Sequence, residues 1–116
     1  MKRPRIAAHR ERDLEKLKKS LKWFEKDLNK KIAKFFEGHY SEDYAAQQRG
    51  DALKLYGLLI HVDAIRVKAD MELTGVGVHR ITKPPEISIV KDAEPGAWRG
   101  EGKDATPIYF YHLVKE

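Results

Sequence analysis

Between residues 11 and 37, apolar positions recur every three or four residues, which is the period of an amphipathic helix. The apolar stripe consists of Leu14, Leu17, Leu21, Phe24, Leu28, Ile32 and Phe35. The opposite side carries a row of cations, namely Arg12, Lys16, Lys19, Lys22, Lys26, Lys30 and Lys34. Trp23 points into this row. We expect one long helix from near Arg10 to Glu37, ended by Gly38.

A second helix is expected to begin at Ser41. Serine is a good N-cap, and Glu42 and Asp43 suit the positive end of a helix dipole. The short link at 38–40 favours an antiparallel helical hairpin. Residues 52–62 are apolar almost all round, so we expect this segment to be the most buried part of the chain.

Two glycines, Gly50 and Gly57, interrupt the second helix and lie on nearly the same side of it. Each destabilises a helix by about 1 kcal/mol relative to alanine. Either another backbone comes close there, or the helix ends at Gly57 and residues 61–67 form a strand. We favour the continuous helix, reaching residue 74.

The pattern changes after Gly75. Residues 76–82 alternate loosely, residues 86–91 are β-branched and apolar, and residues 107–115 alternate most regularly. Residues 92–106 form a polar loop rich in glycine. These features predict an α+β fold, with an N-terminal long antiparallel helical hairpin followed by a small, roughly three-stranded antiparallel sheet.

The length of 116 residues fits a single domain, residues 1–116. We divide it into a basic arm (1–9), the helical hairpin (10–74) and a β-rich part (75–116). The absence of cysteine excludes disulfides and thiolate metal ligands. No apolar run approaches the ~18 residues of a membrane span, and no secretory signal is evident, so a cytoplasmic location is expected.

Positive charge is concentrated in the first helix. The net charge is +5 overall, with +7 in residues 1–37 and −2 in residues 38–116. Lysines spaced by four residues repel one another on a helix, which suggests that an external anion supplies the counter-charge. Nucleic acid and an acidic protein are the candidate partners; a face that only confers solubility is the alternative.

We expect partner contacts at Lys19, Lys22, Trp23, Lys26, Lys30, Lys34, Trp98 and Arg99. For Trp23, the alternatives are stacking on a base, contact with a partner, or burial under the C-terminal sheet. Trp98 and Arg99 belong to the glycine-rich loop, which fails the phosphate-loop pattern. Five residues separate Gly96 from Gly102, where that pattern needs four. No nucleotide or other cofactor is therefore expected.

Catalytic and metal sites have little support. The spacing of His61, His79 and His112 matches no zinc pattern, so no metal ligand or catalytic residue is predicted. The leading hypothesis is a non-enzymatic interaction module that forms a homodimer, because the apolar helix surface exceeds what a short chain can bury. The alternatives are sequence-independent nucleic-acid binding, and a small enzyme or ligand binder with a pocket lined by these histidines.

Overall fold

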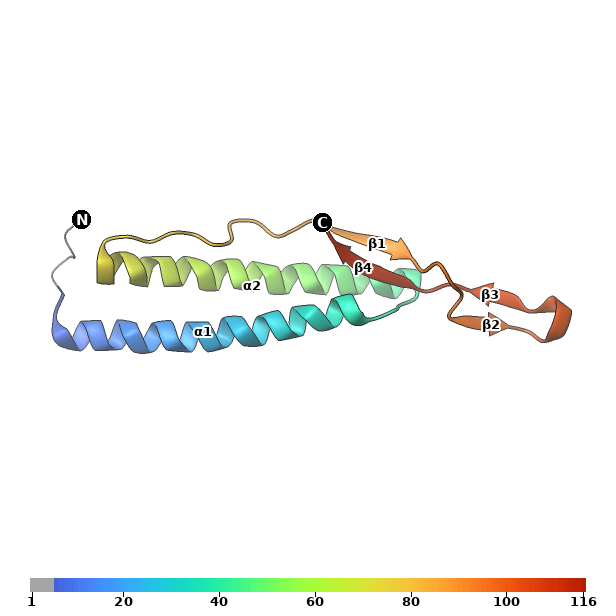
Figure 1. Ribbon diagram of the computed structural model, residues 1–116, viewed down its shortest axis with the longest axis horizontal. Helices are drawn as coiled ribbons and strands as arrows, with labels where there is room; N and C mark the ends of the chain where they lie inside the picture. The colour runs from blue at the N-terminus through green and yellow to red at the C-terminus, as the bar shows by residue number, and fades with distance from the viewer. Residues whose placement is uncertain (1–5) are drawn as a thin grey trace. The chain divides into compact units, whose positions relative to one another are not determined.

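Two long helices dominate the chain. The computed structural model describes residues 6–116 and contains helix α1 (Ala8–Glu37) and helix α2 (Glu42–Thr74) (Figure 1). The predicted helical hairpin is thus confirmed. Ser41 caps α2, since its Oγ accepts a hydrogen bond from the backbone N–H of Tyr44 at 3.4 Å. Of the expected basic arm, residues 1–5 lie outside the described residues.

Helix α2 continues through both of its glycines, as expected. A Cβ placed on Gly50 or Gly57 would meet no atom within 4 Å, so no described backbone approaches there. Residues 52–62, which we expected to be the most buried segment, are only partly buried. Ala52, Tyr56, Leu59 and Val62 are buried, but Gly57 and Leu58 are exposed, because only part of the helix surface has a covering neighbour.

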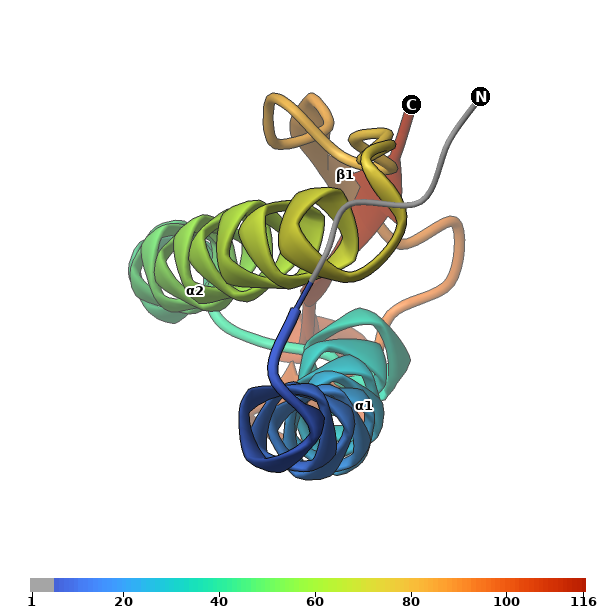
Figure 2. The ribbon, with the colours of Figure 1, turned by 90° about the vertical axis from the view of Figure 1, so that its left-hand side faces the viewer.

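The chain divides into two compact units, each built from parts of both helices. The first contains the chain up to Lys31 together with Leu55–Pro84, and the second contains Ile32–Lys54 and Pro85–Glu116. In the first unit, a core cluster joins α1 and α2 through Leu14, Ala69 and Leu73, and Ile6 packs against it. The paired helices are seen end-on in Figure 2.

Also in the first unit, residues 75–84 run back along α2 as an extended segment (Figures 1 and 2). Residues 76–82 do not form the strand that was expected there. The Val78 carbonyl and the Arg80 N–H bond to side chains of α2 and not to a neighbouring strand. The segment lies so close to the helix that a Cβ on Gly77 would be 2.5 Å from the carbonyl oxygen of Val67.

The second unit contains two small antiparallel sheets in place of the single three-stranded sheet expected. Strand β1 (Ile87–Lys91) pairs with β4 (Tyr111–Lys115), and β2 (Ala97–Arg99) pairs with β3 (Thr106–Ile108). A 3-10 turn, Gly102–Asp104, joins β2 to β3. The strand expected at 107–115 is therefore split, and the expected loop at 92–106 contains β2 and the start of β3. The α+β class is nevertheless correct.

An isolated β-bridge pairs the turn between the helices with the larger sheet. Tyr40 and Tyr111 exchange two backbone hydrogen bonds, at 2.8 and 2.7 Å. The Tyr40 hydroxyl donates to the carbonyl of Phe35 at 2.9 Å. Arg49 of α2 donates to the carbonyl of Ile87 at 2.6 Å. The turn, the end of β1 and the start of β4 thus lie side by side within the second unit.

Candidate functional site

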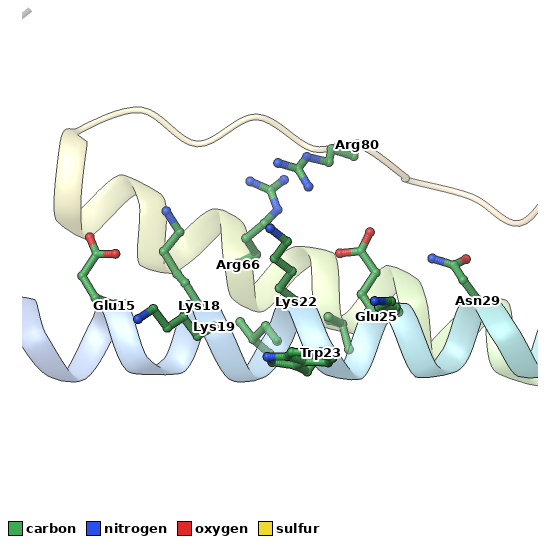
Figure 3. Close-up of a pocket in the computed structure, with 12 residues that line it drawn as sticks. Glu15, Lys18, Lys19, Lys22, Trp23, Glu25, Asn29, Arg66 and Arg80 are labelled. Carbon is green, nitrogen blue, oxygen red and sulfur yellow. The ribbon is translucent and has the colours of Figure 1, made fainter.

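The first unit contains an open cleft of about 860 Å³ (Figure 3). It is lined by Glu15, Lys18, Lys19, Leu21, Lys22, Trp23, Glu25, Lys26, Asn29, Val62, Arg66 and Arg80. We call it the basic cleft, because six of these residues are Lys or Arg and two are Glu. The charged ends of Lys18, Lys22, Arg66 and Arg80 point toward the same space.

Four charged side chains, which we call the charged network, hold one wall of the basic cleft together. They are Lys18, Asp63, Arg66 and Asp70. Lys18 of α1 lies 2.7 Å from one oxygen of Asp70, and Arg66 donates to the other oxygen at 2.6 Å. Arg66 also donates to Asp63 at 2.9 Å and to the carbonyl of Val78 at 2.6 Å. The network therefore links α1, α2 and the segment 75–84.

The hydrogen bonds of this network favour the ionised form of both of its carboxylates. Burial alone would raise the pKa of Asp63, but hydrogen bonds from Arg66 and from the backbone N–H groups of Arg80 and Ile81 outweigh it and lower the pKa. Burial would likewise raise the pKa of Asp70, and the hydrogen bonds and charges of Lys18 and Arg66 lower it. Both acids thus neutralise cations on the wall of the cleft.

Other cations of the basic cleft are not neutralised. Within residues 6–116, the side chains of Lys19, Lys22 and Arg80 form no ion pair. The ammonium of Lys26 lies 5.2 Å from the centroid of the Trp23 ring, within cation–π range. The Trp23 side chain is 69% exposed, which leaves the indole available to a ligand.

The structure brings together half of the residues expected to contact a partner. Lys19, Lys22, Trp23 and Lys26 line the basic cleft. Two other expected contacts, Lys30 and Lys34, are exposed on α1 without lining it.

The remaining two, Trp98 and Arg99, lie exposed on β2 in the second unit. The cleft is also lined by Lys18, Arg66 and Arg80, which were not predicted as contacts. The spacing of Asp63, Arg66 and Asp70 by three and four residues was a usable signal for the charged network. Nothing local in the sequence signalled Arg80.

The three histidines considered above belong to different units, His61 and His79 to the first and His112 to the second. His61 is exposed, and His79 Nδ1 lies 3.4 Å from an oxygen of Asp63 in the first unit. In the second unit, the carboxylate of Asp92 accepts hydrogen bonds from two imidazoles, at 2.6 Å from His39 and 2.5 Å from His112. Neither His39 nor Asp92 was predicted as a site residue.

Comparison of the chain with protein-family models, with curated proteins and with solved structures finds no match in any of the three. Its function must therefore be inferred from its own residues. Neither described helix combines the length and apolar character needed to cross a membrane.

Proposed function

We propose that this protein binds single-stranded nucleic acid, without sequence preference, through the basic cleft. The observation that carries the proposal is that Lys19, Lys22 and Arg80, all without ion-pair partners among residues 6–116, line the same cleft as the exposed indole of Trp23. Backbone phosphates would be neutralised by these cations, as in other electrostatic nucleic-acid interfaces.

The preference for single strands follows from Trp23. A base stacks on an aromatic ring only when it is unpaired and accessible, and such stacking contributes about 1–3 kcal/mol per base. Lys26 lies near the indole at 5.2 Å and adds positive charge beside the stacked base. Sequence readout is not expected, because base recognition normally uses a cluster of Arg, Asn and Gln side chains. Among the described residues that line the cleft, Arg66 is held by Asp63 and Asp70, which leaves Arg80 and Asn29 for such contacts.

The test uses fluorescence from Trp23. The chain has two tryptophans, so the Trp98→Phe variant leaves Trp23 as the single indole. Titration with an oligothymidylate of about 15 nucleotides at low salt should quench this fluorescence, because the base stacks on the ring. A duplex of the same length should quench it less. No quenching and no binding to either nucleic acid would contradict the proposal.

Homodimer formation belongs to the same proposal. The exposed large apolar side chains of the first unit include those of Leu17, Phe24 and Leu58, with exposed fractions of 39%, 52% and 46%. A second copy that covers them would remove apolar area from water. Sedimentation velocity at micromolar concentration should give a dimer. A monomer at every concentration would remove this part of the proposal and leave the basic cleft unaffected.

A further inference from the structure

The larger sheet places three side chains with metal-binding chemistry on one face. Residues opposite each other in an antiparallel pair point to the same side. His112 is opposite Val90, and the N–H of Asp92 bonds to the carbonyl of Phe110, so His112 and Asp92 share a face. The Tyr40–Tyr111 bridge sets His39 beside His112 on that face, with ring centroids 5.8 Å apart.

The donor atoms of these three residues already lie close together. One ligand atom from each of His39, Asp92 and His112 lies within 4.8 Å of the others. Zinc binds nitrogen and oxygen ligands at about 2.0–2.2 Å, so an ion at this point would replace the two hydrogen bonds to Asp92. Each imidazole then binds through an unprotonated nitrogen, and the proton that faced Asp92 moves to the other ring nitrogen or to solvent. The His39 side chain is 59% exposed, which gives an ion a path to the site and leaves room for water as a further ligand.

The charge balance also favours a cation. A carboxylate and two imidazoles bind a metal as an anion and two neutral ligands, so this set offers one negative charge to a divalent cation. Among the described residues, the ionic partners of Asp92 are these two imidazoles. Lys91, the adjacent cation, is on the opposite face, where its ammonium lies 4.3 Å from the centroid of the Tyr109 ring.

We propose that His39, Asp92 and His112 form a binding site for one divalent transition-metal ion of the Zn²⁺ class. Imidazole nitrogens select such ions over Mg²⁺ and Ca²⁺, which prefer all-oxygen ligands. The bound ion joins the turn between the helices to β1 and β4. It is independent of the basic cleft, which belongs to the first unit.

The experiment titrates the untagged, metal-free chain of 116 residues with Zn²⁺ by calorimetry and with Co²⁺ by visible absorption. We expect one ion per chain, a d–d spectrum of nitrogen and oxygen ligation, and a higher melting temperature. His39→Ala should weaken binding by more than about 100-fold. His39 is exposed, so this variant should keep its fold, which circular dichroism checks.

The matched control is His61→Ala, which removes an exposed histidine of the first unit and should leave affinity unchanged. Asp92→Asn tests the carboxylate separately and should weaken binding while leaving the bulk of the side chain in place. The proposal is overturned if the wild type binds neither ion at a stoichiometry of one. It is equally overturned if a folded His39→Ala variant retains wild-type affinity.

Discussion

The buried carboxylate of Asp63 accepts a hydrogen bond at 3.0 Å from the backbone N–H of Arg80, which lies 17 residues further along the chain. The same oxygen accepts a weaker one, at 3.4 Å, from the N–H of Ile81. The other oxygen accepts from Arg66. One acid in α2 therefore anchors the extended segment that carries Arg80 to the basic cleft.

Asp63→Ala should destabilise the first unit by about 3 kcal/mol, because it leaves the nearly buried Arg66 with an incomplete set of partners. Urea denaturation measures the loss. Asp51→Ala is the control, since it also removes an aspartate from α2. Asp51 lies 3.7 Å from Lys54, whose side chain is 83% exposed, so its loss should change stability by less than about 0.5 kcal/mol. Equal losses in the two variants would show that Asp63 does not anchor the segment.

Stability should fall in acid because the pKa values of Asp63 and Asp70 are lowered in the folded chain. In the unfolded chain an aspartate has a pKa of about 3.9, so the unfolded state binds more protons in this range. The stabilisation is therefore fully present above about pH 5 and is lost as pH falls through the lowered folded pKa values. Melting temperatures from neutral to acidic pH measure this. A variant carrying both Asp63→Asn and Asp70→Asn should show a smaller drop; an unchanged drop would mean that other acids cause it.

The sequence predicted the helices well because their signals are local. The apolar period of α1 and the cap at Ser41 each involve residues within a few turns of one another. Residues 75–84 were predicted incorrectly because the contacts that hold this segment are not local in the sequence. Val76 and Val78 alternate as in a strand, yet they are 44% and 67% exposed, and the segment is held by α2 side chains distant in sequence.

The same difference between local and long-range signals explains which residues of the two candidate sites could be predicted. The lysines on α1 were found because they recur along one helix, whereas Arg80 reaches the basic cleft through a long-range bond. His39 and Asp92 meet His112 only through strand register and the Tyr40 bridge. Strand β2 has three residues, too few for an alternating pattern to be read.

Gly57→Ala should stabilise α2 by about 1 kcal/mol, because the new methyl group meets no atom within 4 Å and alanine favours the helix. Gly77→Ala is the contrasting change. Its methyl group would be 2.5 Å from the Val67 carbonyl oxygen, so the segment must move, which should destabilise the protein by about 1–3 kcal/mol. Thermal melting compares the two. Destabilisation by Gly57→Ala would indicate that another backbone, such as that of a second copy, packs against this glycine.

Trp23→Ala should leave the melting temperature unchanged, because the side chain is 69% exposed. Affinity for an oligothymidylate should fall by about 1–3 kcal/mol if a base stacks on the indole. Fluorescence anisotropy with a labelled strand measures the decrease. Trp98→Ala, which removes the other exposed indole, is the control and should bind like the wild type. A drop in melting temperature for Trp23→Ala would identify Trp23 as a packing residue.

The most direct test of nucleic-acid binding is the slope of log K against log salt for a labelled single strand. Changing Lys19 and Lys22 to glutamine should reduce the magnitude of this slope by about 0.7 for each phosphate that is no longer neutralised. Changing Lys16 and Lys31 to glutamine is the charge-matched control on the same helix, outside the basic cleft, and should affect the slope much less. The account predicts this difference at unchanged melting temperature. Equal slopes for the two double variants, or no binding by the wild type at low salt, would contradict it.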